Sequence, residues 1–205
     1  MVMQWGQFLD HDITLTPEND VECECGDEEN NDDECFPIPI PTNDPLYSTL
    51  PSPPTCLHFS RSTAFCTSTP REQFNLITSY IDGSSIYGSD QTTADLLREF
   101  SGGELTTSVV NNNLLPVIDG ARLAGDVRAQ EQPGLTSMHT LWMREHNRIA
   151  KDFAASDPSL SDEDVFQESR KMVIAQLQNI AYSEWLPKIL GNDQMTKYGL
   201  TVNKR

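Results

Sequence analysis

Residues 4–12 read QWGQFLDHD, and this short stretch carries the strongest indication of architecture and chemistry in the chain. Residues three or four positions apart lie on one face of a helix, so Gln7, Asp10 and His11 would share a side. Asp12 would turn away from them. One face then presents an amide, a carboxylate and an imidazole. A histidine on a helix face is commonly a packed core residue, and spacing alone leaves a catalytic and a packing interpretation open.

A second polar segment, TSYIDGS at residues 78–84, places oxygen-bearing groups at alternating positions. Hydroxyl, carbonyl and carboxylate oxygens can converge on one hard cation if the segment curls. It is not an EF-hand loop, because Ile86 stands where that pattern requires an acidic or amide ligand. Taken by itself, the segment is more typical of an ordinary turn in which Ser and Thr satisfy the backbone.

A third segment, AGDVRAQE at residues 124–131, contains Arg128 and Glu131 three positions apart. Such a pair is ordinarily a surface ion pair worth about 0–1 kcal/mol. Nothing local makes it catalytic.

The charge of the chain excludes one class of partner. Its formal net charge is −17, and many of its acids fall in the block DVECECGDEENNDDE at residues 20–34, which is typical of a solvated loop. Nucleic-acid binding requires a basic face, so nucleic acid is not expected as a partner. We expect no membrane span, because no run of 18 apolar residues exists. No signal peptide is visible after Met1. Either the protein is cytosolic, or its natural N-terminus lies upstream of Met1.

The five cysteines favour the second of these possibilities. They are confined to residues 23–66, a proline-rich and loop-like region. Clustered cysteines in such a region indicate disulfides and an oxidising compartment. A zinc site is the alternative, but Cys23 and Cys25 lack the two-residue spacing of zinc ribbons. An odd number leaves at least one thiol without a partner inside the chain.

The pattern of polar and apolar residues predicts a mainly α protein with long, disulfide-stapled loops. A short helix is expected over residues 3–12, and residues 16–72 form an irregular, stapled excursion. Residues 74–88 look extended or looped. Asp90 can cap a short helix over residues 92–100, ended by two glycines.

Two long helices are predicted in the C-terminal third. Thr136 or Ser137 can cap the first. Ser161 begins a capping box for the second, with aspartate in place of glutamate, and Pro187 and Gly191 break it. The residues expected to point inward are Met138, Leu141, Trp142, Ile149 and Phe153 in the first helix, and Val165, Met172, Val173, Leu177, Ile180 and Ala181 in the second.

These segments, in this order, resemble the animal haem peroxidase family. Similarity extends from about Met3 to about Lys197. Four separated matches carry it: CFPIPIPTNDP at 35–45, REQFNLITSYIDGSSIYGSD at 71–90, RLAGDVRAQEQPGLTSMHTLWMREHNRIA at 122–150 and YSEWLPKILG at 182–191.

The resemblance implies a role for each matching residue. His11 would be the distal histidine, which moves a proton between the two oxygens of peroxide as general base and then acid. Arg128 would stabilise negative charge as the O–O bond breaks. Gln7 would hydrogen-bond the distal water or halide. Asp10 and Glu131 would be the carboxylates that form esters with haem b.

The resemblance also implies a calcium site. Asp12, Thr78, Asp82 and Ser84, with the backbone carbonyl of Tyr80, would be its ligands. A cation held by Asp12 would fix the neighbouring catalytic imidazole.

Further expectations come from the same resemblance. Cys23 would pair with Cys35 and Cys25 with Cys56, while Cys66 would have its partner upstream of the chain. Gln132 stands where one branch of the family has a methionine bonded to the haem, so that link is not expected. The oxidised donor would then be iodide, bromide or thiocyanate more than chloride.

The family holds haem iron through a proximal histidine. The family's proximal helix lies beyond the YSEWLPKILG segment. Residues 1–205 are therefore expected to form a partial haem peroxidase domain, the distal half. This part alone is not expected to have stable peroxidase activity. His58 lies in the cysteine-rich loop. His139 and His146 match family positions that are not ligands, and helix packing is favoured over a metal site formed with Glu145.

The function expected by family is therefore a secreted haem peroxidase. It would reduce hydrogen peroxide and oxidise a halide, thiocyanate or a phenolic donor. The alternative is a non-enzymatic or degenerate extracellular module that binds calcium.

Overall fold

A computed structural model describes residues 1–26, 34–65, 69–111 and 113–202. By its contacts the chain divides into two compact units. One unit combines Met1–Thr14 with Ile77–Arg205, and the other is Leu15–Leu76. The stapled excursion expected at 16–72 falls inside the second unit.

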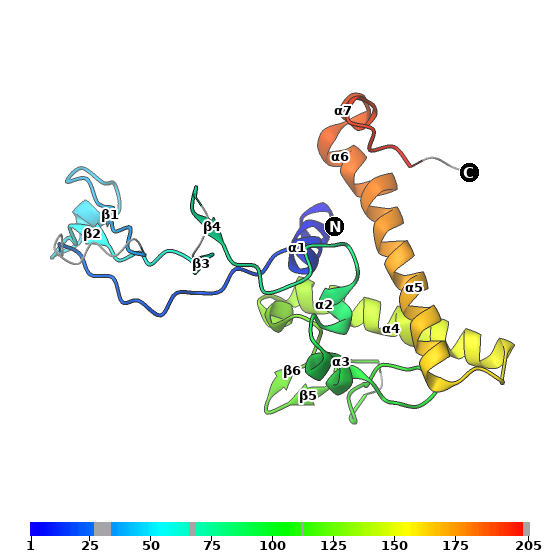
Figure 1. Ribbon diagram of the computed structural model, residues 1–205. Helices are drawn as coiled ribbons and strands as arrows, with labels where there is room; N and C mark the ends of the chain where they lie inside the picture. Colours follow the sequence, from blue (N-terminus) through cyan, green and yellow to red (C-terminus); the bar gives the residue numbers. More distant parts are fainter. Residues whose placement is uncertain (27–33, 66–68, 112, 203–205) are drawn as a thin grey trace. The chain divides into compact units, whose positions relative to one another are not determined.

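The first unit is mainly helical, as predicted (Figure 1). The segment expected to be extended at 74–88 ends in a short helix. The elements of the unit are α1 (Val2–Ile13), α2 (Ser84–Tyr87), α3 (Gln91–Leu97), β5 (Val117–Ile118), β6 (Ala121–Arg122), the 3-10 helix η3 (Val127–Gln130), α4 (Pro133–Ser156), α5 (Asp162–Ile180), the π-helical η4 (Ala181–Trp185), α6 (Leu186–Leu190) and α7 (Asn192–Lys197).

The ends of the two long helices follow from local capping. In α4 the side chain of Gln132 accepts the Gly134 backbone N–H, and Pro133 occupies the first turn. Proline suits that position because its missing N–H needs no partner there, so α4 begins before the predicted Thr136. The predicted capping box of α5 is present: Ser161 and Asp164 bond reciprocally.

The helix after α5 does not break at Pro187, contrary to the sequence prediction. Residues Ala181–Trp185 continue as a π-helical segment, and Pro187 lies in the first turn of α6. A proline there removes no hydrogen bond that the helix needs. Gly191, with φ of 77°, does separate α6 from α7 as expected.

The helical core joins α1, α2, α4 and α5. Phe8 packs edge-on against His139, and Trp5 lies 6.0 Å from Trp142 between ring centroids. Two predicted core residues are instead exposed, Leu141 and Met172. Apolar spacing defines a broad face, and packed neighbours cover only part of it.

The second unit contains short paired strands and two disulfides. The disulfides are Cys23–Cys35 and Cys25–Cys56, which confirms the expected pairing. Cys66 and the acidic residues 27–33 lie outside the described residues. The elements are β1 (Ile38–Pro39) paired with β2 (Cys56–Leu57), β3 (Ala64–Phe65) paired with β4 (Glu72–Gln73), and the 3-10 helix η2 (Tyr47–Thr49).

Within the described part of the chain, no helix combines the length and the apolar character that crossing a bilayer requires.

Candidate active site

The face of α1 expected to carry polar chemistry does so. His11 is almost completely buried, with 3% of its side chain exposed. Gln7 donates through Nε2 to Glu131 Oε2 at 3.1 Å, and His11 Nε2 lies 3.8 Å from the same oxygen. Gln7 and His11 thus both contact the carboxylate of Glu131, which lies 120 or more positions away in the chain.

Arg128 joins this face from η3, and its main partner is Asp126. The ion pair with Glu131 that the spacing ordinarily indicates is not found among the described residues. Instead its Nε donates to Asp126 Oδ1 at 2.9 Å and its Nη2 to Asp126 Oδ2 at 2.8 Å. A second carboxylate, Asp10, lies 4.0 Å from Nη1. The reason is local: Asp126 caps η3 and so sits beside the arginine two residues on.

Asp126 is therefore a site residue that the sequence reasoning missed. Its carboxylate is 2% exposed, and Oδ1 lies 3.7 Å from His11 Nδ1. Burial opposes its charged form, but hydrogen bonds from Arg128 outweigh this and lower the pKa of Asp126. An aspartate two residues before an arginine at a 3-10 N-terminus was the only signal available.

The electrostatic surroundings keep His11 neutral. Burial, and after it the positive charge of Arg128, lower the pKa of His11 below its usual value. Asp126, Glu131 and Asp10 oppose this shift without cancelling it. A neutral imidazole can accept a proton near pH 7.

Gln132 is a second residue whose contacts were not foreseen. Its side-chain Nε2 donates to Gln7 Oε1 at 2.8 Å and to Gln4 Oε1 at 2.6 Å. Its own Oε1 accepts the Gly134 N–H at the start of α4. Gln132 therefore fixes which end of the Gln7 amide points to Glu131.

The opposite side of α1 carries Asp12, which is buried. Its Oδ2 accepts the backbone N–H groups of Asp82 and Gly83, each at 3.1 Å, and its Oδ1 accepts that of Ser85 at 2.9 Å. Burial raises the pKa of Asp12, and these backbone hydrogen bonds oppose the rise. Asp12 thereby ties the segment before α2 to the residue next to His11.

Four of the five expected calcium ligands gather around this contact. Thr78 Oγ1 lies 3.0 Å from Asp82 Oδ1 and 3.3 Å from Ser84 Oγ. Ser84 Oγ is also 3.3 Å from both the backbone oxygen and Oδ1 of Asp12. The side chain of Tyr80 is exposed, so only its carbonyl could join them.

This oxygen cluster fits calcium in its chemistry. Calcium takes carboxylate, hydroxyl and carbonyl oxygens together. Across the described ranges, no group of three or more His, Cys, Asp or Glu residues that could hold a metal ion is found, and this cluster contains two carboxylates, Asp12 and Asp82.

The His11 face also fits haem in its donor set. The carboxylates of Asp10 and Glu131 are 54% and 48% exposed, on either side of the buried imidazole. Both are accessible to a bound group, whereas His11 and Arg128 lie deeper.

The two histidines of α4 lie in the core. His146 bonds the Tyr87 hydroxyl through Nδ1 and the Gly103 carbonyl through Nε2, both at 2.9 Å. His139 packs on α1, and Glu145 pairs with Arg148. The three residues considered for a metal site do not converge.

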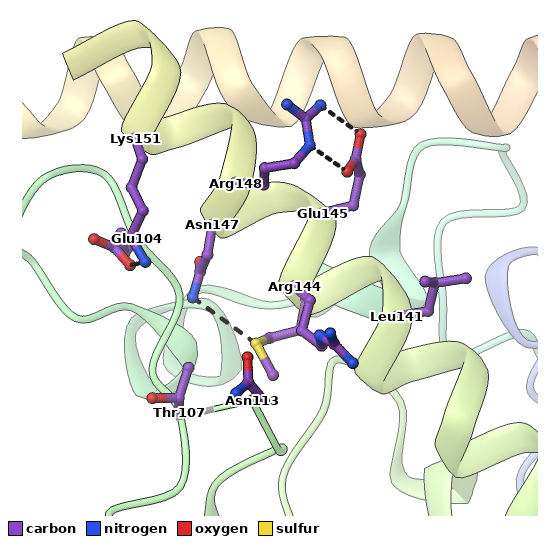
Figure 2. A pocket seen from close by; sticks show the side chains of 10 residues that line it. Glu104, Thr107, Asn113, Leu141, Arg144, Glu145, Asn147, Arg148 and Lys151 are labelled. Carbon is purple, nitrogen blue, oxygen red and sulfur yellow. Dashed lines mark hydrogen bonds and ion pairs between the residues drawn. The ribbon is translucent and has the colours of Figure 1, made fainter. Parts of the chain in front are cut away.

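A cavity of about 500 Å³ opens on another face of α4, lined by residues that include Glu104, Arg144 and Lys151 (Figure 2). Lys151 pairs with Glu104, and Arg148 with Glu145. No residue of the His11 face lines it.

Gly125, next to Asp126, packs directly on the backbone of α2. A Cβ at this position would lie 2.4 Å from the Ser84 carbonyl oxygen, 2.5 Å from the Gly88 nitrogen and 2.6 Å from the Ile86 carbonyl carbon. All three are backbone atoms of α2 or its end, which cannot rotate aside.

Gly125→Ala is therefore expected to lower the free energy of unfolding by about 2 kcal/mol or more, since overpacking forces the backbone to shift. Urea unfolding followed by tryptophan fluorescence measures it. The matched control is Gly134→Ala, where the added carbon meets the flexible ends of Gln4 and Gln132. Equal stability of the two variants would contradict the packing described here.

Comparison with known proteins shows the family of the chain. The model of the animal haem peroxidase family matches residues 1–205. The chain is 40% identical to the peroxidasin homolog of Mus musculus over 97% of the chain and 16% of that protein. It is 39% identical to Homo sapiens myeloperoxidase over 97% of the chain and 30% of that protein. The chain thus spans less than a third of either.

Solved structures agree. Peroxidase A of Dictyostelium discoideum matches with a TM-score of 0.72 and 32% identity, over 91% of this chain and 39% of that one. A fatty acid α-dioxygenase of Oryza sativa has the same TM-score at 21% identity, over 96% of this chain and 30% of that one, a likeness of fold. On the family match and these identities, the chain belongs to the animal haem peroxidase family.

Proposed function

We propose that this chain supplies the distal, peroxide-handling face of a haem peroxidase. The observation that carries the proposal is one shared face on which a buried, neutral His11 lies among Arg128, Asp10 and Glu131. The substrate would be hydrogen peroxide, and the reducing donor a halide, thiocyanate or a phenol.

His11 would act as the proton carrier. Its lowered pKa leaves the ring neutral near pH 7. Nε2 of the neutral ring could accept the proton from one oxygen of peroxide and then donate it to the departing oxygen.

Arg128 would stabilise the negative charge that develops as the O–O bond breaks. Asp126 already holds the guanidinium through two hydrogen bonds. A cation fixed in advance needs little reorganisation during the reaction, which is the condition for strong electrostatic stabilisation.

Asp10 and Glu131 would hold haem b, as esters, and Gln7 would orient the distal water or halide. When bound, the haem supplies the redox chemistry, and the protein supplies orientation and electrostatics. We assign neither His139 nor His146 as its iron ligand, because His146 is bonded to Tyr87 and Gly103 and His139 packs against Phe8.

Calcium would bind to Asp12, Thr78, Asp82, Ser84 and the Tyr80 carbonyl. Asp82→Ala is expected to remove it, because the variant deletes one of the two carboxylates in the oxygen cluster. Elemental analysis after dialysis against calcium should find about one ion per wild-type chain and none in the variant.

The control for this experiment is Asp152→Ala, an exposed acid on α4 that pairs with Arg148. It changes the charge equally and should leave the calcium content at the wild-type value. Unchanged calcium in Asp82→Ala would remove that ligand from the proposed set.

Extracellular location is supported by the two disulfides and by similarity to peroxidasin homologs. One observation favours the alternative of a non-enzymatic calcium-binding module. The oxygen cluster is formed without any of the residues on the His11 face, so calcium could bind in the absence of haem. Protein containing this chain should be titrated with haem and assayed with peroxide and iodide. A Soret band with turnover supports the peroxidase, whereas calcium binding without haem binding supports the module.

A further inference from the structure

Asp126 contacts both residues that the proposed reaction needs. Its Oδ2 accepts from Arg128 Nη2, and its Oδ1 accepts from Arg128 Nε. The same Oδ1 lies 3.7 Å from His11 Nδ1. Two groups from separate elements, α1 and η3, therefore share one buried carboxylate.

The backbone fixes the place of this carboxylate. Asp126 Oδ1 also accepts the Arg128 backbone N–H at 2.9 Å, as the cap of η3. The preceding Gly125 lies in close contact with the backbone of α2. Asp126 thus has little freedom to move toward or away from His11.

The ring of His11 faces carboxylates on both sides. Nδ1 is buried and has no hydrogen-bond partner among the described residues. At 3.7 Å, Asp126 is too far for a hydrogen bond but near enough for strong attraction in a buried setting. Nε2 faces Glu131, which is half exposed and already accepts a hydrogen bond from Gln7.

We propose that Asp126 is a positioning residue that holds the His11 ring proton on Nδ1 and the guanidinium of Arg128 in place, which leaves the Nε2 lone pair free for peroxide. This inference rests on the proposed function for its purpose, but its geometry belongs to the chain alone. A carboxylate that sets a histidine tautomer is a known device of acid–base sites.

Asp126 and Glu131 attract the His11 ring proton to opposite nitrogens, and Asp126 has the stronger effect because it is buried. A charge 2% exposed acts through protein, whereas one 48% exposed is screened by water. A lone pair on Nδ1 would face the buried carboxylate and be repelled, whereas an N–H there is attracted.

The test reads the tautomer directly, without haem. Long-range proton–nitrogen NMR of the ¹⁵N-histidine-labelled chain at pH 7.5 should show His11 protonated on Nδ1. In Asp126→Asn the ratio of the Nδ1–H to the Nε2–H form should fall about tenfold or more, because the buried charge is gone. The Arg128 Nε–H signal should also exchange with water about tenfold faster or more, since its acceptor is weakened.

Glu131→Gln is the matched control, because it makes the same change at the other carboxylate beside His11. It should leave the tautomer and the Arg128 signal as in the wild type. The Nε2–H form in the wild-type chain would overturn the inference, even where Asp126→Asn does not fold. So would a larger tautomer change in Glu131→Gln than in Asp126→Asn.

The two proposals fail in different ways. An Nδ1–H tautomer in protein that binds no haem would overturn the proposed function and leave the positioning by Asp126 intact. Haem binding and turnover with the Nε2–H tautomer would overturn only the inference about Asp126.

Discussion

His11→Ala is expected to slow the reaction with hydrogen peroxide by about two orders of magnitude or more in haem-loaded protein that contains this chain. The variant removes the group that moves the proton from one peroxide oxygen to the other. Because His11 is buried and its lowered pKa keeps it neutral, water is a poor substitute at this place. Stopped-flow absorbance in the Soret region measures the rate as peroxide concentration is varied.

Arg128→Ala should reduce the same rate by a comparable factor, about two orders of magnitude, through loss of charge stabilisation. Arg144→Ala is the matched control: this arginine is exposed at the cavity on the other face of α4 and should leave the rate unchanged (Figure 2). Removing Arg128 leaves the Asp126 carboxylate buried without its partner, so the calcium content and thermal unfolding of each variant should be compared first. A near-normal rate for Arg128→Ala in folded protein would remove it from the role assigned here.

The part of the site that was predictable lies on one helix. Spacing in α1 places Gln7 and His11 together and turns Asp12 away, because helical geometry is regular over a few residues. The structure agrees: Gln7 and His11 meet Glu131, while Asp12 meets the backbone of Gly83 and its neighbours.

The contacts that were missed join segments distant in sequence. Asp126 and His11 are brought together by the packing of η3 and α1 around α4, which no local pattern encodes. The same holds for the oxygen cluster. Thr78 and Ser84 read as an ordinary turn until Asp12, some 70 positions away, is placed beside them.

The apolar periodicity also predicted more core residues than the structure buries. Leu141 satisfies the apolar spacing of α4 yet is exposed beside the cavity of Figure 2. Spacing defines a broad face, and only the packed neighbours decide how much of that face is covered.

The helical core should lose stability steeply between pH 6.5 and pH 4. Burial lowers the pKa of both His139 and His146 from 6.5 to about 4. For His146, Arg98 adds to this effect and the hydrogen bond to Gly103 opposes it. The unfolded chain takes up these protons below about pH 6.5, whereas the folded chain resists them until about pH 4. Stability is therefore complete above the higher value and falls as the pH is lowered through the window, by about 3 kcal/mol for each ring.

Burial, rather than its hydrogen bonds, explains why His146 resists a second proton, since the bond to Gly103 favours the charged ring. As a neutral ring it donates from Nε2 to the Gly103 carbonyl and accepts at Nδ1 from the Tyr87 hydroxyl. Burial raises the pKa of Tyr87 well above its usual value, so this hydroxyl keeps its proton. A second proton on His146 would require the Tyr87 hydroxyl to turn and accept, and would leave a charged ring fully buried.

His146→Gln isolates this contribution. Glutamine offers a donor and an acceptor but does not titrate. Free energies of unfolding in urea should therefore fall less steeply for the variant between pH 6 and pH 4.5, by about 1.4 kcal/mol per pH unit. The comparison uses slopes, so the variant's own loss of packing and the acids common to both proteins cancel. Identical slopes would show that His146 takes up its proton in the folded chain as readily as in the unfolded one, and would contradict the buried, neutral ring described here.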